Sequence, residues 1–283
     1  MQAATPVHLD ALPLLPVLDQ HLLTLLRSLA PADWQRPTLA RQWMVKDLAA
    51  HLLDGNLRTL SLLRDGYYGP QPSADLSSYA GLVAYLNQLN AEWVVAARRL
   101  SPAVLIELLA QSGREYTDFL ATLDPWAPAT FAVAWAGESQ SANWFHIARE
   151  YTEKWHHQQQ IREAVGQPEP LLTPTLFRPF LETILRGLPH AYRAVAAPVG
   201  TVVQVRVLGA SGGTWQLLRT PDAWQLRHLE LEAKPAAELV LPPGVAWKLF
   251  TKGLSPAEAR PAATLRGEQR LAEAALHLVA VMA

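Results

Sequence analysis

The sequence predicts an α+β protein in which an antiparallel helical bundle is followed by a smaller α+β domain. Up to about residue 190, apolar side chains recur at the three- and four-residue spacing of amphipathic helices, and the connections between these segments are short. The pattern changes after Pro198, where residues 201–208 alternate between apolar and polar side chains as a half-buried strand does. We therefore predict two domains, residues 1–195 and residues 196–283.

Six helices are expected in the first domain. Pro13 and Pro16 indicate that the first regular helix begins near Val17, and Ser101 followed by Pro102 is typical of a helix N-terminus. The expected helices span residues 17–29, 45–65, 77–100, 102–123, 141–165 and 173–188.

The second domain is expected to contain several short strands and two helices. Its glycine-rich segment, residues 209–213, lies between two strands and has no G-K-[ST] ending, so it predicts a hairpin turn and not a phosphate loop. The expected strands are at residues 201–208, 214–219, 224–229 and 237–241, and the expected helices at residues 245–252 and 269–282.

Composition excludes several classes of function. The 283 residues include 24 basic and 25 acidic side chains, so no overall field favours nucleic acid or an anionic membrane. There are no cysteines, which excludes disulfides, a cysteine nucleophile and thiolate metal ligands. No secretory signal is evident, and no apolar run approaches the ~20 residues that span a bilayer. We expect a cytoplasmic protein with neither nucleic acid nor membrane as its partner.

A polar stripe follows the fifth expected helix. His146, Glu150, Glu153, His157 and Gln160 recur at spacings of four, three, four and three residues, so they share one helix face. This face is either solvated or supplies metal ligands to the interior of the bundle. The stripe contains no lysine or arginine, although both are common on solvated faces, which favours the metal interpretation. A separate apolar stripe comprises Trp144, Ala148, Tyr151 and Trp155.

His51, on the second expected helix, is a candidate third ligand. It is flanked by leucines, and it is either a core histidine or a residue that converges with Glu153 and His157 on one metal ion. Asp47 and Asp54 share its general face, where they are either partners of the ligands or exposed carboxylates.

Three segments make a family resemblance visible. They read Trp34-Gln-Arg-Pro37, Trp43-Met-Val-Lys-Asp47-Leu-Ala-Ala-His51-Leu and Glu153-Lys-Trp-His-His157-Gln-Gln-Gln-Ile161. In this pattern the chain resembles the mycothiol-dependent maleylpyruvate isomerase family. Residues 237–241, 247–253 and 265–272 are similar to the small C-terminal domain of that family.

The resemblance implies a DinB/YfiT-like four-helix bundle that binds metal, with a sterol-carrier-like α+β domain after it. Carried over to this chain, it implies that His51, Glu153 and His157 ligate a divalent metal, most commonly zinc, with nickel or another divalent ion as alternatives. It also implies a low-molecular-weight thiol of the mycothiol or bacillithiol type as cosubstrate. In the isomerase the thiol adds to a conjugated double bond, permits rotation and leaves, whereas relatives transfer the thiol to electrophiles.

One position departs from the family pattern. Gln160 stands where an acidic residue is usual, so the environment of the metal ligands is expected to differ. His156 is interpreted as peripheral, because helical geometry turns it about 100° from His157. His146 lies almost three turns from His157 and is too distant to ligate the same ion.

Three functions remain open at this point. The first is a metal-dependent isomerase or transferase that acts on a small molecule with a thiol, as a monomer or homodimer. The second is a hydrolase whose metal activates water. The third is a non-catalytic module that binds a small ligand.

Overall fold

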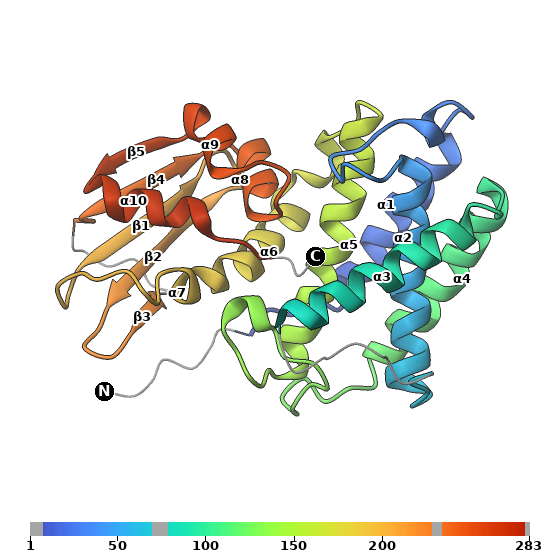
Figure 1. The fold of residues 1–283 in the computed structure, drawn as a ribbon, viewed down its shortest axis with the longest axis horizontal. Coiled ribbons are helices and arrows are strands. Elements are labelled where there is room, and N and C mark those ends of the chain that lie inside the picture. The colour runs from blue at the N-terminus through green and yellow to red at the C-terminus, as the bar shows by residue number, and fades with distance from the viewer. Residues whose placement is uncertain (1–7, 70–78, 228–233, 281–283) are drawn as a thin grey trace. The chain divides into compact units, whose positions relative to one another are not determined.

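The computed structural model describes residues 8–69, 79–227 and 234–280 (Figure 1). A helical N-terminal part precedes a C-terminal part that contains a five-stranded sheet, which confirms the predicted α+β class. The chain divides into two compact units. We call Ala11–Thr130 with Glu153–Pro168 the helical unit, and Phe131–Thr152 with Glu169–Val281 the mixed unit. Compactness alone does not define a domain boundary, so the boundary between residues 195 and 196 stays a prediction.

The helical unit contains four long helices and the second half of a fifth. These helices are α1 (Leu14–Ser28), α2 (Val45–Thr59), α3 (Tyr79–Ala97), α4 (Pro102–Leu120) and α5 (Asn143–Ala164). A π-helical turn, Leu60–Arg64, extends α2 to one residue before the predicted end at residue 65. Helix α4 contacts α1 and α2, and α2 also contacts α3. The antiparallel four-helix arrangement stays a prediction, as does the start of the third helix at residue 77, which lies outside the described residues.

Local sequence signals set several helix ends. The Ser101 hydroxyl accepts a hydrogen bond from the Val104 backbone N–H at 3.3 Å, so the predicted N-cap of α4 is confirmed. At the start of α2, the Asp47 carboxylate accepts the Met44 N–H at 3.1 Å. Helix α1 begins three residues earlier than predicted. A proline in the first turn of a helix forfeits no internal hydrogen bond, so Pro16 is accommodated there.

An apolar core holds the helices of this unit together. Its buried members come from all five helices and from the turn that contains Trp34, and they include Leu22, Leu48, Ala97, Leu105 and Ile161. Ile161 belongs to the same helical segment as the candidate ligands Glu153 and His157. Burial of the end of α5 in this core therefore fixes the position of the segment within the helical unit.

The mixed unit is built on one five-stranded sheet. Its strands are β1 (Val202–Val207), β2 (Gly213–Arg219), β3 (Trp224–Arg227), β4 (Ala237–Leu241) and β5 (Thr264–Gly267), in the order β3-β2-β1-β4-β5. The pair β1 and β4 is parallel and the other pairs are antiparallel. The predicted hairpin turn between β1 and β2 is confirmed. A Cβ on Gly212 would lie 2.0 Å from the Val207 carbonyl oxygen, so this turn requires glycine.

Helices complete the mixed unit. They are α6 (Pro174–Ile184), α7 (Leu188–Ala191), α8 (Pro243–Phe250), α9 (Pro256–Ala259) and α10 (Gln269–Ala274), together with the first half of α5. Helix α10 packs on β1, β4 and β5 (Figure 1). The final helix is shorter than the predicted range 269–282. After α10 a single 3-10 turn follows, and the backbone is extended at Leu278.

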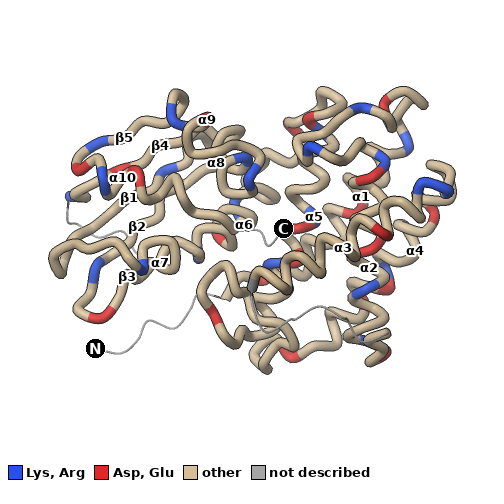
Figure 2. Tube along the Cα trace, viewed as in Figure 1, with Lys and Arg blue, Asp and Glu red and all other residues tan. Residues whose placement is uncertain are grey.

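Positions of basic and of acidic residues both occur along the trace of each unit (Figure 2). Among the described residues, no helix combines the length and the apolar character that a membrane crossing demands.

Candidate metal site

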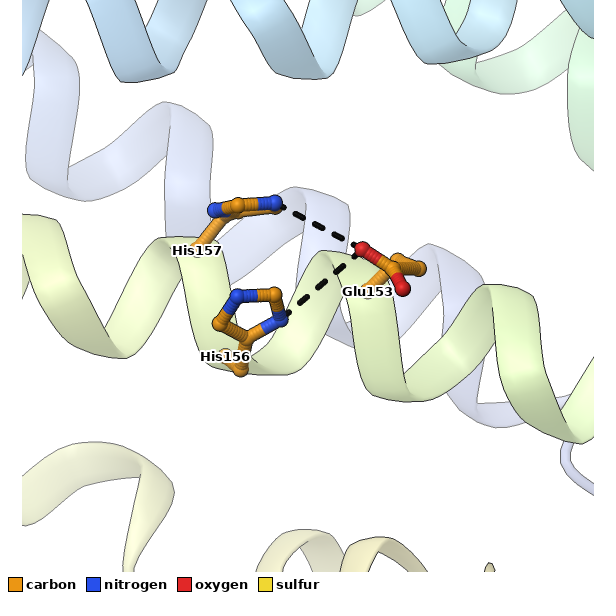
Figure 3. Close-up of side chains that lie close together, drawn as sticks. All are labelled: Glu153, His156 and His157. Atoms are coloured by element: carbon orange, nitrogen blue, oxygen red, sulfur yellow. Dashed lines mark ion pairs between the residues drawn. The ribbon is translucent and has the colours of Figure 1, made fainter. Parts of the chain in front are cut away.

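The second half of α5 carries a cluster of side chains suited to metal ligation. Within the described part of the chain, Glu153, His156 and His157 form a group whose potential ligand atoms all lie within 4.8 Å of one another. Figure 3 shows the two imidazoles on the same side of the helix as the carboxylate. Glu153 Oε2 lies 3.5 Å from His157 Nε2 and 3.9 Å from His156 Nδ1.

The spacing between Glu153 and His157 suits a shared zinc ion. Two ligand atoms at about 2.0–2.1 Å from a tetrahedral zinc ion lie roughly 3.4 Å apart. The 3.5 Å separation of Glu153 Oε2 and His157 Nε2 is close to that value, whereas the 3.9 Å separation to His156 is wider. The pair at positions i and i+4 is therefore the better matched of the two.

Gln160 orients His157. Its amide oxygen Oε1 lies 3.0 Å from His157 Nδ1. An amide oxygen can only accept, so the contact suits the tautomer of His157 that has its proton on Nδ1 and its lone pair on Nε2, the nitrogen near Glu153. Histidines that ligate metals commonly donate from their second nitrogen to an acceptor that fixes the ring. The amide of Gln160 supplies this acceptor without a negative charge.

His51 lies against the same cluster. The centroid of its ring is 4.7 Å from that of His157, with the two planes at 82°. Its Nδ1 atom is buried and has no hydrogen-bond partner among the described residues. A buried nitrogen without a protein partner is uncommon, and a metal ion would satisfy it. The three residues therefore fit a divalent metal by chemistry, although the ligand set stays a prediction.

The imidazole of His51 is held in its neutral form. Burial lowers its pKa well below the usual value of 6.5, the neighbouring His157 lowers it further, and Glu153 opposes both effects. Neutral imidazole is the form that binds metals.

The interpretation of His156 as peripheral is wrong. Its ring centroid lies 3.8 Å from that of His157, and its side chain is buried. The 100° between successive helical positions describes the Cα–Cβ directions, and rotation about the side-chain bonds brings the two rings together. Residues three apart are neighbours on a helix surface, so the spacing between Glu153 and His156 is a sequence signal that the two side chains lie close together.

Asp47 and Asp54 are buried, so the alternative that they are exposed carboxylates is wrong. Asp47 accepts a hydrogen bond from the Met44 N–H at the start of α2 and forms an ion pair with Arg98. Asp54 forms an ion pair with Arg58 at 3.0 Å. Burial raises the pKa of Asp54 to about 6, although the positive charge of Arg58 acts to lower it.

Helix α5 is buried on both of the stripes that the sequence defines. All four members of the apolar stripe are less than 7% exposed. On the polar stripe His146, His157 and Gln160 are buried and the two glutamates are partly exposed. The interpretation of the polar stripe as a solvated helix face is therefore wrong.

The fold and the site together define an α+β protein whose helical unit holds a cluster of histidines and a carboxylate. The sequence profile described as "Mycothiol maleylpyruvate isomerase N-terminal domain" matches residues 15–162, more than half of the chain. The chain belongs to this family, which confirms the resemblance drawn from the sequence.

Two solved structures share the fold. One is described as the mycothiol-dependent maleylpyruvate isomerase, at 14% identity and a TM-score of 0.53. The other is a mutant of the mycothiol-dependent maleylpyruvate isomerase, at 13% identity and the same TM-score. Each match covers 92% of this chain and 93% of the other. No curated protein matches the sequence.

Proposed function

We propose that the protein is a divalent-metal-dependent enzyme that uses a low-molecular-weight thiol to isomerise an electrophilic small molecule or to transfer the thiol to it. Family membership carries this proposal, because the two structural relatives are both described as mycothiol-dependent maleylpyruvate isomerases. We further propose that the protein acts in the cytoplasm, as a monomer or homodimer.

In this proposal His51, Glu153 and His157 hold the metal, with zinc as the first candidate. Three protein ligands leave one position of a tetrahedral ion open for an exogenous ligand. A metal bound there would lower the pKa of a thiol and stabilise the thiolate, as it does for bound water. In this proposal the Gln160 oxygen, 3.0 Å from His157 Nδ1, accepts the proton of that nitrogen and leaves Nε2 available as a ligand.

The first experiment measures metal content and metal affinity. Purified protein should contain about one equivalent of metal by elemental analysis, and each of His51→Ala, Glu153→Ala and His157→Ala should lose it. His277→Ala is the matched control, since His277 is an exposed histidine remote in sequence from the cluster. A protein that binds neither zinc nor nickel, or whose affinity is unchanged in the three variants, would contradict the metal site.

The second experiment tests thiol dependence. The zinc-loaded enzyme should isomerise maleylpyruvate only when a thiol of the mycothiol or bacillithiol type is added, and the thiol should be recovered unchanged because it adds and then leaves. Turnover of an ester or amide without any thiol would instead support a metal-dependent hydrolase. A retained ligand together with no bound metal would support a non-catalytic binding module.

A further inference from the structure

An indole side chain lies beside the candidate ligands in the helical unit. The centroid of the Trp43 ring system is 4.8 Å from the His51 ring, with the planes tilted by 44°, and 6.4 Å from the His157 ring. His51 therefore contacts an aromatic ring on one side and the imidazole of His157 on another. Trp43 precedes α2, the helix that carries His51.

The two histidines are oriented by different means. His157 Nδ1 lies in hydrogen-bond distance of the Gln160 amide oxygen, whereas His51 Nδ1 has no hydrogen-bond partner in the part of the chain that the structure describes. The terminal torsion of a histidine side chain is broad, so a ring without a hydrogen bond needs packing to fix its orientation. The Trp43 indole, in contact range of His51, supplies that packing.

The backbone around Trp43 is itself well held. The Trp43 carbonyl oxygen accepts hydrogen bonds from the Thr38 backbone N–H at 3.2 Å and from the Thr38 hydroxyl at 2.7 Å, and the Trp43 N–H donates to the Ala40 oxygen at 2.7 Å. Pro37 and Met44 form a β-bridge across this loop. The indole is thus presented from a closed loop and not from a free chain segment.

We propose that Trp43 is a positioning residue of the metal site, which holds the His51 imidazole in its ligating orientation by aromatic packing. This inference rests on the proposed function, because it assigns a role only if His51 ligates a metal. Residues that orient metal ligands typically alter metal affinity by about 10–100-fold when they are replaced. Packing against one face constrains the ring less than a directed hydrogen bond does, so we expect the lower end of this range.

The test compares Zn²⁺ affinity in folded variants. Trp43→Leu should weaken Zn²⁺ binding about tenfold, and Trp43→Phe, which retains an aromatic ring, should restore most of the loss. The Co²⁺-substituted Trp43→Leu protein should also show an altered visible absorption spectrum, because the arrangement of ligands around the ion changes. Trp126→Leu is the control, since Trp126 is an exposed tryptophan of the same unit. Unfolding of the metal-free proteins in urea separates loss of fold stability from loss of affinity.

A second measurement covers the case in which Trp43→Leu does not fold. Bound Ni²⁺ quenches the fluorescence of tryptophans at short range. Saturating Ni²⁺ should therefore reduce the fluorescence of the wild-type protein and of Trp126→Phe by the same absolute amount. The reduction should be smaller in Trp43→Phe. Equal quenching in all three, or unchanged Zn²⁺ affinity and Co²⁺ spectrum in Trp43→Leu, would overturn the role of Trp43 while leaving the metal site intact. A wild-type protein that binds no metal would overturn both proposals.

Discussion

Replacement of Asp19 should test how the buried charge next to the candidate site is compensated. Lys154 Nζ lies 3.0 Å from Asp19 Oδ1, 2.8 Å from Asn56 Oδ1 and 4.7 Å from the centre of the Tyr116 ring. The side chains of the ion pair are only 10% and 17% exposed. Removal of one partner from a buried ion pair typically costs about 3–5 kcal/mol, because the remaining charge is left uncompensated. Asn56 and Tyr116 still contact the ammonium group, so we expect Asp19→Leu to cost about 3 kcal/mol.

Urea unfolding of the metal-free protein, followed by circular dichroism, measures this cost as a change in the free energy of unfolding. The double variant Asp19→Leu/Lys154→Met should recover most of the loss, since an apolar pair of similar volume often replaces a buried ion pair without cost. Glu115→Gln, in an exposed ion pair with Arg64, is the control and should leave stability unchanged within error. A loss below about 1 kcal/mol in Asp19→Leu, or a double variant less stable than the single one, would refute the reasoning.

Three further predictions concern pH, glycine and the amide beside His157. Burial lowers the pKa of His146 from 6.5 to about 4. Below pH 6.5 the unfolded state therefore binds more protons at this residue than the folded state does. Stability should therefore decrease by up to about 3 kcal/mol between pH 6.5 and 4 on account of this residue, and His146→Phe should flatten the dependence in unfolding curves measured across that range. Gly55→Ala should stabilise the protein by up to about 1 kcal/mol, because the methyl group enters open space in a helix, whereas Gly113→Ala should gain less. The added Cβ of Gly113→Ala would lie 2.5 Å from Asp19 Oδ2, and the ion pair with Lys154 holds that carboxylate in place. Equal increases in the melting temperature of the two variants would contradict this account. Gln160→Leu should weaken Zn²⁺ binding about 10–100-fold in calorimetry, while Gln160→Glu, which keeps an acceptor, should not.

The sequence predicts the helices better than it predicts their ends. Period and capping signals are local, so α4 begins where Ser101 and Pro102 indicate. The predicted start of α1 near Val17 is three residues late, because a first helical turn accepts Pro16 and the helix begins directly after Pro13. The end of the last helix is misjudged because an apolar segment is compatible with either a helix or an extended chain, and packing decides between them.

Pairing within the sheet is not readable from local pattern. The alternation in residues 201–208 predicts a strand but not its neighbours, and β1 pairs in parallel with β4 across some thirty residues of intervening chain. Strand β5 was not expected as a strand at all. Only one of its four residues, Thr264, is β-branched, so the local sequence favours a strand weakly. Its place at the sheet edge depends on pairing with β4, which is a tertiary contact.

The candidate site is predicted in part for the same reason. The spacing of Glu153 and His157 is local, and the structure places them 3.5 Å apart as a shared helix face requires. The positions of His156 and Trp43 depend on side-chain rotation and on a loop, neither of which a helical repeat encodes.

The buried polar groups of α5 fall into two kinds, and this difference is what supports a functional site. Lys154 is neutralised by Asp19 and Arg162 donates to the His21 oxygen, so these two residues have protein partners that compensate for their burial. His51 faces the same helix with a buried nitrogen that no described residue satisfies. A buried polar atom without a partner costs about 1–3 kcal/mol, and a bound ion is a common compensation. The His51 ring lies 4.7 Å from that of His157, so a metal ion bound between them and Glu153 would satisfy this nitrogen.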